Sequence, residues 1–226
     1  YIKLSITSAL GGYGSGRELY VFKVPGTESY LPGDINNDRL IDMNDFTSYM
    51  NYTGLRQGDA DFEGYVSNGD INRNGLIDAY DISVIATRLR GGIDKKEVEK
   101  IAGTIKISTA KQNYNKDEII EIQVKGNNLR SVNAISFALP YNQQDYEFVG
   151  VELQNMQDME NLTNDRLHTN GEKALYPTFV NIGNKESLEG NLDLFVLKFK
   201  AKHKLKFDLK AQDGILVDKN LNTQKF

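Results

Sequence analysis

The chain has no cysteine and no tryptophan, and only two histidines and four prolines among its 226 residues. Without cysteine there is no disulfide framework, and cysteine usage identifies no cellular compartment. No apolar run approaches the roughly 18 residues that a membrane span needs, so we expect no such span. The formal charge of −4 argues against a nucleic-acid partner, which would need a clustered basic face.

The length and an apolar content of 39 % are sufficient for one large or two small folded domains. The first residue, Tyr1, opens directly on a strand-like pattern. We therefore expect a piece cut from a longer protein, with any signal peptide lying upstream.

One acidic sequence motif occurs twice. "GDINNDRLIDMNDF" starts at Gly33 and "GDINRNGLIDAYDI" starts at Gly69, and eight of the first thirteen positions are identical. Internal repetition of this kind is the first feature of a sequence to explain.

The spacing of oxygen-bearing side chains within the repeated motif predicts two twelve-residue calcium loops. Such a loop supplies ligands from positions 1, 3, 5, 9 and 12 and a main-chain carbonyl from position 7. In the first loop these are Asp34, Asn36, Asp38, Leu40 (carbonyl), Asp42 and Asp45; in the second they are Asp70, Asn72, Asn74, Leu76 (carbonyl), Asp78 and Asp81. Calcium suits them because it accepts six to eight oxygens in flexible geometry, whereas magnesium demands a rigid octahedron. Two unrelated Asx-rich turns would not explain a complete tandem match.

The two loops differ at position 6, where a sharp turn favours glycine. The second loop has Gly75 there, but the first has Arg39, which must adopt a left-handed conformation. Position 12 is aspartate in both loops. With four carboxylates against three, the first loop should bind calcium at least as tightly unless Arg39 offsets this advantage.

Each loop is followed by an apolar periodicity typical of a helix, and Gly54 and Gly91–Gly92 are expected to end these helices. No entering helix is apparent before either loop. The stretch Asp59–Asp70 also has acidic residues at loop spacing, but Asp70 already begins the second loop. We therefore interpret Asp59–Glu63 as an acidic connecting loop rather than a third ion site.

Paired half EF-hands of this form resemble a dockerin module, over about residues 31–92. The resemblance implies two bound Ca²⁺ ions, folding that depends on them, and docking onto a cohesin domain. It places the partner contacts at loop positions 10 and 11. Here these are Met43, Asn44, Ala79 and Tyr80. The unequal pairs argue against binding in two equivalent orientations.

From Gly103 onward the hydrophobic period changes to two. "IIEIQVK", "VNAISFALP", "YEFVGVEL", "LYPTFVNI", "LDLFVLKF", "KLKFDLK" and "GILVD" read as strands of a β-sandwich. This region resembles a cohesin domain, a jelly-roll sandwich, on "GTIKIS", "YNKDEIIEIQVKG", "ISFALPYNQQDYEFVGVE" and "NLDLFVLKFKA". The segment 155–173 reads as a polar insertion between strands.

Two further features bear on ligands. A sugar-stacking platform could be built from Tyr114, Tyr141, Tyr146 and Tyr176, although alternation places several of them on buried faces. The two histidines, His168 and His203, are isolated, and we expect them on the surface or in loops rather than on a metal.

The predicted organisation is therefore multidomain: a β-hairpin stub at 1–30, which resembles the end of a discoidin-like sugar-binding module; an all-α dockerin-like unit at 31–92; a linker at 93–102; and a cohesin-like sandwich at 103–226. The function that follows is a non-catalytic accessory region of a secreted, cell-surface or periplasmic polysaccharide-degrading enzyme. It would assemble with a cohesin or dockerin domain of another protein or with its own neighbouring domain. The alternative is a carbohydrate-binding module with the calcium pair as a spacer.

Overall fold

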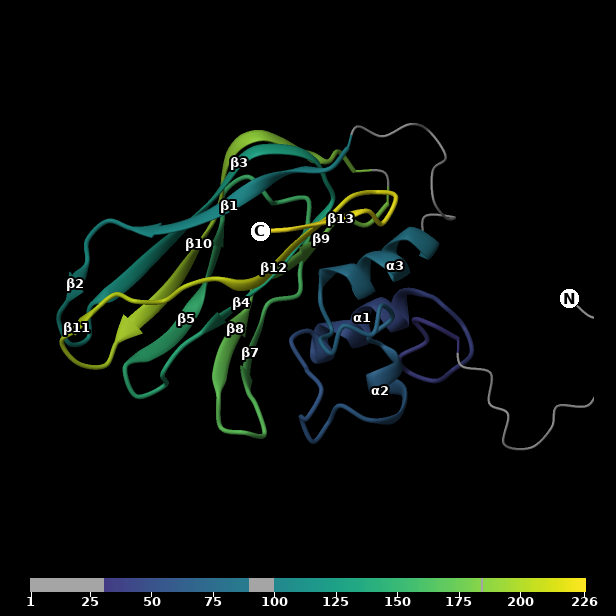
Figure 1. The fold of residues 1–226 in the computed structure, drawn as a ribbon, viewed down its shortest axis with the longest axis horizontal. Coiled ribbons are helices and arrows are strands. Elements are labelled where there is room, and N and C mark those ends of the chain that lie inside the picture. Colours follow the sequence, from purple (N-terminus) through teal and green to yellow (C-terminus); the bar gives the residue numbers. More distant parts are fainter. Residues whose placement is uncertain (1–30, 90–99, 184) are drawn as a thin grey trace, which may run out of the picture. The chain divides into compact units, whose positions relative to one another are not determined.

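The computed structural model describes residues 31–89, 100–183 and 185–226, and within them a small helical module precedes a β-sandwich (Figure 1). The helices of the module are α1 (Met43–Tyr52), α2 (Gly64–Asn68) and α3 (Ala79–Leu89). The predicted N-terminal stub and residues 90–99, most of the predicted linker, lie outside the described residues. Residues Leu31–Phe226 cluster as one compact unit.

Helices α1 and α3 follow the two repeated loops as predicted. Asp42 caps α1 in a capping box, its side chain accepting from the Asn44 N–H while Asp45 accepts from the Asp42 N–H. The helix ends at Tyr52, with Gly54 left-handed at φ 82° just beyond it. The expectation that no helix enters the second loop was wrong, because the single turn of α2 ends at Asn68.

The first sheet of the sandwich has the strand order β1-β3-β10-β5, with all neighbours antiparallel. Its strands are β1 (Ala102–Thr109), β3 (Ile119–Val132), β10 (Leu188–Ala201) and β5 (Tyr146–Leu153). The β3–β10 pairing carries several register shifts, which let these long strands bend with the sandwich. A two-stranded ribbon lies apart from it, formed by β2 (Asn113–Tyr114) and β11 (Leu205–Lys206).

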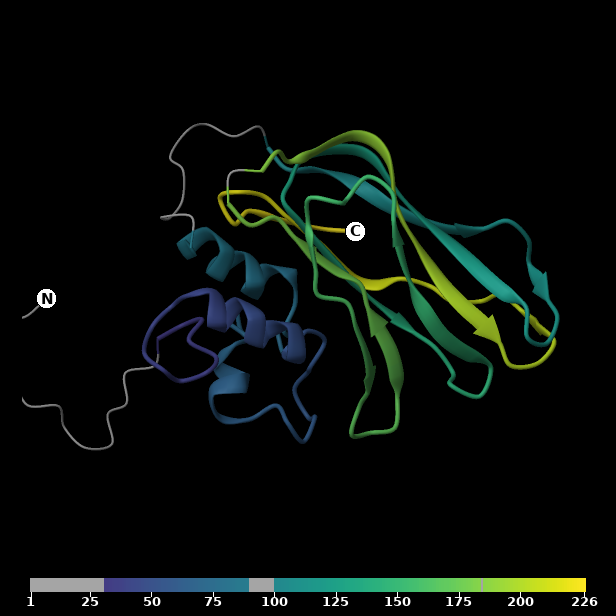
Figure 2. The same cartoon turned by 180° about the vertical axis from the view of Figure 1, so that it is seen from behind.

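The second sheet has the order β13-β12-β4-β8-β7, and β9 pairs with both β4 and β6. Its strands are β13 (Thr223–Lys225), β12 (Gln212–Val217), β4 (Ala134–Pro140), β8 (Lys173–Tyr176), β7 (Asn164–Leu167), β9 (Thr178–Val180) and β6 (Glu160–Asn161). Seen from either side, the helices lie beside this sheet and not beside the first (Figures 1 and 2).

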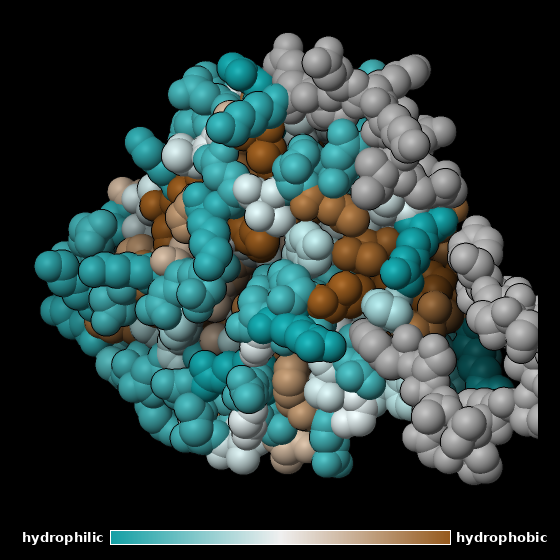
Figure 3. Space-filling model, turned by 45° about the vertical axis from the view of Figure 1, so that its right-hand side comes forward, coloured by the Kyte–Doolittle hydropathy of each residue, from teal (hydrophilic) through white to brown (hydrophobic). Residues whose placement is uncertain are grey.

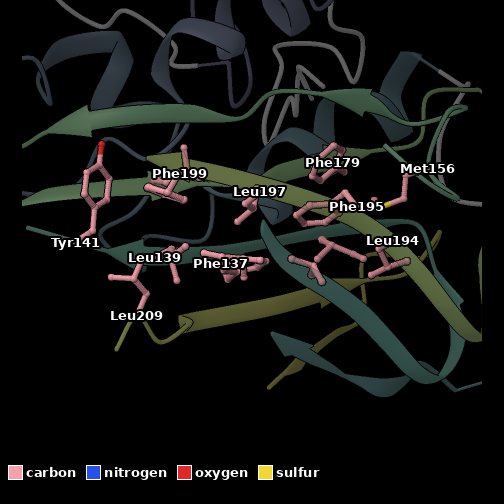
Figure 4. Packing of buried hydrophobic residues seen from close by; sticks show 14 of the residues in the cluster. Phe137, Leu139, Tyr141, Met156, Phe179, Leu194, Phe195, Leu197, Phe199 and Leu209 are labelled. Carbon is pink, nitrogen blue, oxygen red and sulfur yellow. The ribbon is translucent and has the colours of Figure 1, made fainter. Parts of the chain in front are cut away.

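Between the two sheets lies an aromatic-rich core (Figure 4). Phe195 stacks on Phe137 at 6.4 Å between ring centroids and tilts against Phe179 at 4.7 Å. Two expectations fail here. The strand predicted from "KLKFDLK" shrinks to the two residues of β11, and the supposed polar insertion 155–173 contains β6 and β7 and buries Met156 and Met159 in the core.

No helix among the described residues is long and apolar enough to cross a membrane.

Candidate functional site: the calcium loops and the docked face

The two repeated loops have the same internal hydrogen bonds. In the first, the carboxylate of Asp34 accepts from the N–H groups of Asp38 and Arg39, at 3.0 and 2.9 Å. In the second, Asp70 accepts from Asn74 and Gly75 at 3.0 and 2.8 Å. The position-1 carboxylate therefore organises the turn of each loop in the same way.

Position 12 closes each loop in the same manner. The carboxylate of Asp45 accepts from the N–H groups of Ile35 and Asp42, and that of Asp81 accepts from Ile71 and Asp78. Asp45 and Asp81 are both fully buried. Each loop thus folds its first and last carboxylates inward.

Position 6 behaves as predicted in both loops. Arg39 takes a positive φ of 71°, and Gly75 takes 87°. Arginine meets a steric cost in this conformation that glycine does not.

Burial is the main factor that raises the pKa of the inward-facing carboxyls. The pKa of Asp45 is raised by burial and, to a smaller extent, by repulsion from Asp34. Burial and the neighbouring charge of Asp78 hold the pKa of Asp81 well above its usual range. Gathering negative charge in this way is costly unless a cation shares the site.

The donor set in each loop fits calcium, because it consists of carboxylate, amide and main-chain carbonyl oxygens. Among the described residues, no three or more His, Cys, Asp or Glu side chains are grouped closely enough to form a metal site by themselves. The loops would therefore depend on their Asn36 and Asn72 amides and on the Leu40 and Leu76 carbonyls as well as on carboxylates.

The residues predicted for partner contact fall in two different environments. Met43 and Asn44, at the start of α1, are exposed. Ala79, at the start of α3, is fully buried, and its N–H donates to the Ser136 hydroxyl of β4 at 3.1 Å. Tyr80 is half-buried. Only the second copy of the repeat thus contacts the sandwich at position 10.

The outer face of the second sheet is apolar where α3 covers it. Strand β4 directs Ile135, Phe137 and Leu139 into the core between the sheets, whereas the alternating Ala134 packs in a hydrophobic cluster with the module. The other members of this cluster are, from the module, Ile35, Phe46, Tyr49, Leu55, Ile77, Ala79, Ile82, Ile85 and Ala86, and, from the sandwich, Leu162, Val180, Ile215 and Val217. The module and the outer sheet face therefore share one apolar core.

The second loop itself lies against the sheet. Leu76 packs against Ala138, Ala174 and Tyr176. Gly54 also lies close to the sheet, since a Cβ placed there would be 2.4 Å from the Tyr176 ring. Small residues on both sides thus allow the module and the sheet to approach closely.

Several residues that carry this contact were missed by sequence reasoning. His168 lies in the loop between β7 and β8, one of the two expected positions, but it is buried; its Nδ1 lies 2.8 Å from Asp59 Oδ2 and its Nε2 lies 2.8 Å from the Tyr176 hydroxyl. The acidic connecting loop contributes Asp59 to this contact. A usable signal was the strand "VNAISFALP", whose outward residues Ala134, Ser136 and Ala138 are all small and include none of the long polar or charged side chains typical of a solvated face.

The four tyrosines considered for a sugar platform, Tyr114, Tyr141, Tyr146 and Tyr176, are all buried. The hydroxyl of Tyr141 donates to Asp165 and that of Tyr146 donates to Asp208, and burial together with these carboxylates raises the pKa of each phenol. The expectation that several of them lie on buried faces is therefore confirmed, and these four residues form no exposed platform for a sugar.

The helical module matches a known protein family. Residues 32–90 match the family "Dockerin type I domain". No curated protein matches the chain. Solved structures similar to it include a cohesin module from a Clostridium perfringens family 33 glycoside hydrolase (12 % identity, 56 % of this chain and 90 % of that one, TM-score 0.44). Another is a type II cohesin domain from the cellulosome of Acetivibrio cellulolyticus (11 % identity, 55 % of this chain and 89 % of that one, TM-score 0.45).

A third similar chain comes from a type I cohesin–dockerin complex of Clostridium thermocellum (13 % identity, 57 % of this chain and 91 % of that one, TM-score 0.42). The chain therefore combines a small helical region that matches the type I dockerin family with an all-β sandwich.

Proposed function

We propose that this chain is a non-catalytic assembly region in which the dockerin-like module docks, in a calcium-dependent manner, onto the cohesin-like sandwich of its own chain. The observation that carries the proposal is the shared apolar cluster between α3 and the outer faces of β4, β9 and β12. A dockerin-like helix pair packed on a sandwich is a protein–protein interface formed within one polypeptide.

The short connection favours pairing within the chain. Only residues 90–99 separate the end of α3 from the described start of the sandwich region at Lys100. A tether of this length holds the two partners at an effective concentration in the millimolar range. Even a modest affinity would then keep the module docked.

Calcium is proposed as the ion that stabilises the docking surface. The two loops would each bind one Ca²⁺ through the residues predicted from their spacing. Bound calcium would neutralise the buried carboxylates at the N-terminal ends of α1 and α3. Extracellular calcium near the millimolar level is sufficient for sites of this class.

We propose that the protein acts outside the cell, in a secreted or surface-attached polysaccharide-degrading system. We base this wider setting on the type I dockerin match, and we propose no catalytic role for these residues. The carbohydrate-binding alternative gains no support, because the tyrosines on which it rested are buried.

The proposal is tested by cutting the chain between the two parts. A specific protease site is inserted after Gly92, the purified full chain is cleaved, and the products are separated by gel filtration. With 2 mM calcium the halves should elute together, and with a chelator they should separate. Asp70→Ala should separate them even in calcium, whereas Asp193→Ala, an exposed carboxylate on β10 paired with Lys125, serves as the matched control.

The uncut chain should elute as a monomer. Separation of the wild-type halves in calcium would contradict docking. A calcium-dependent dimer of the uncut chain would contradict docking within one polypeptide and would instead support pairing between chains.

A further inference from the structure

A second contact between module and sandwich lies away from the helix–sheet core. It involves the β7–β8 hairpin, residues 164–176, and the end of α1 with the segment that follows it, residues 50–60. Unlike the α3 contact, it consists of hydrogen bonds and charged groups.

The hairpin caps the C-terminal end of α1. The Arg166 guanidinium donates through Nε to the Thr53 carbonyl at 2.6 Å and through a terminal nitrogen to the Asn51 carbonyl. The Asn164 amide donates to the Met50 carbonyl at 2.5 Å. The last carbonyls of a helix lack partners and carry a partial negative charge. Helix α1 has no basic residue in its own last turn, so the sandwich supplies the cation.

The hairpin also encloses a carboxylate of the connecting loop. The side chain of Asp59 is 7 % exposed and that of His168 is 1 % exposed. Asp59 accepts from the Thr169 N–H at 3.2 Å, and the Thr169 hydroxyl accepts from the Ala60 N–H at 2.8 Å. His168 is held from its other side by Tyr176, whose ring is nearly perpendicular to the imidazole. A buried carboxylate with these partners fixes the register of the two surfaces, because any shift would leave it with only the Arg56 N–H of its own module, at 3.0 Å.

An outer ion pair completes the contact. Arg56 pairs with Glu172, whose side chain is 61 % exposed. Exposed pairs contribute little. Arg166 and the Asp59–His168 pair therefore carry the recognition.

We propose that the β7–β8 hairpin is the specificity determinant of this sandwich: it accepts a module whose first helix ends in open carbonyls and whose connecting segment places an aspartate opposite His168. This role rests on the proposed docking function, and it assigns the selectivity of docking to one part of the interface. The α3 contact is mainly apolar, with one hydrogen bond from the Ala79 N–H to Ser136, and it would accept other helices that have an apolar face. The hairpin contact requires matched groups at fixed positions.

The test uses the cleaved full chain in calcium and measures the dissociation constant of the two halves. Arg166→Met keeps the aliphatic stem and removes the guanidinium, and His168→Leu removes both imidazole hydrogen bonds. Each should weaken the association about 10- to 100-fold, as expected for the loss of hydrogen bonds to charged or buried groups. His203→Gln is the matched control, because His203 is exposed and bonds Asp145 within the sandwich.

A double-mutant cycle separates recognition from general damage. If Asp59 and His168 act as a pair, Asp59→Ala with His168→Leu should be no weaker than the worse single variant. Full additivity of the two losses would contradict the pairing. The melting temperature of each variant reports on the sandwich.

If Arg166→Met lowers that melting temperature, Arg166→Lys distinguishes a folding defect from lost recognition. Lysine keeps the positive charge but cannot reach both carbonyls, so this variant should still weaken the association of the halves. If Arg166→Lys and His168→Leu leave the affinity unchanged while the wild-type halves stay associated in calcium, the role of the hairpin is overturned and the docking function is not. Wild-type halves that separate in calcium overturn the docking function itself.

Discussion

At the scale of single residues, the two calcium loops differ most at position 6. Gly75 and Arg39 both adopt a left-handed backbone, and only the glycine does so without steric cost. A side chain at Gly75 would meet nothing closer than 3.7 Å. Any effect of a substitution there therefore comes from the backbone and not from a clash.

We expect Gly75→Ala to destabilise the module by about 1 kcal/mol and to weaken calcium binding at the second loop, because alanine disfavours the left-handed conformation. Isothermal titration with calcium checks the affinity and thermal melting checks the stability. Gly190→Ala on β10 has a similar positive φ of 79° and open space around it, so it should cost similar stability and leave calcium affinity unchanged. Equal effects of both variants on calcium binding would contradict this account.

At the scale of elements, α1 and α3 come from the same repeat but have different surroundings. Every residue of α3 from Asp81 to Thr87 is buried, whereas α1 leaves Met43 and Met50 about half exposed. Figure 3 turns the helical side of the molecule forward and shows hydrophobic residues gathered among hydrophilic ones there. The cause of the asymmetry is the sheet face, which packs against α3, whereas the sandwich contacts α1 mainly at its C-terminal end.

The asymmetry predicts unequal responses to the same substitution at position 10. Ala79→Arg should release the module, because arginine at this fully buried position would lose its hydration without gaining a partner. Met43→Arg should leave docking unchanged, because that side chain is 51 % exposed. Gel filtration of the cleaved chain in calcium distinguishes the two. If the module separates from the sandwich in Met43→Arg, or stays bound in Ala79→Arg, the wrong helix has been assigned to the interface.

The repeat could be read from the sequence together with the left-handed turn at position 6 and the helix after each loop, because each of these features depends on residues close together in the chain. The hairpin 164–176 could not. Asn164, Arg166 and His168 look like residues of a polar loop until the module, more than a hundred positions earlier in the sequence, is placed against them. Short-range periodicity contains no information on such a contact.

At the scale of the whole molecule, the docked pair depends on one buried carboxylate whose ionisation is favoured. Burial acts to raise the pKa of Asp59, but hydrogen bonds from the Arg56 N–H and from His168 outweigh it, so its pKa lies below the ordinary value. The charged or titratable groups that interact with this carboxylate are Arg56, Arg166, His168 and Tyr176. A group whose folded pKa is lowered adds stability above its unfolded pKa, near 3.9, and loses it as the pH falls through the folded value.

We therefore expect the halves of the cleaved chain to stay associated at neutral pH and to separate in part below about pH 4 because Asp59 takes up a proton. Because the protein contains many other carboxylates, the wild type is compared with Asp59→Asn, which removes the charge of this one alone. At neutral pH the dissociation constant of this variant should be higher than that of the wild type, and it should rise less steeply as the pH falls. Identical pH profiles for wild type and Asp59→Asn would exclude Asp59 as a contributor.

The sequence by itself determined the two repeated loops, the helices that follow them and most strands of the sandwich, because each depends on residues close together in the chain. Only the tertiary structure decided which helix is covered, that His168 is buried, and that the segment after residue 155 belongs to the sheet and its hairpin. These properties depend on which surfaces meet. That choice is made by the small apolar outer faces of β4 and β12 and by the fit of Arg166 and His168 to a distant part of the chain.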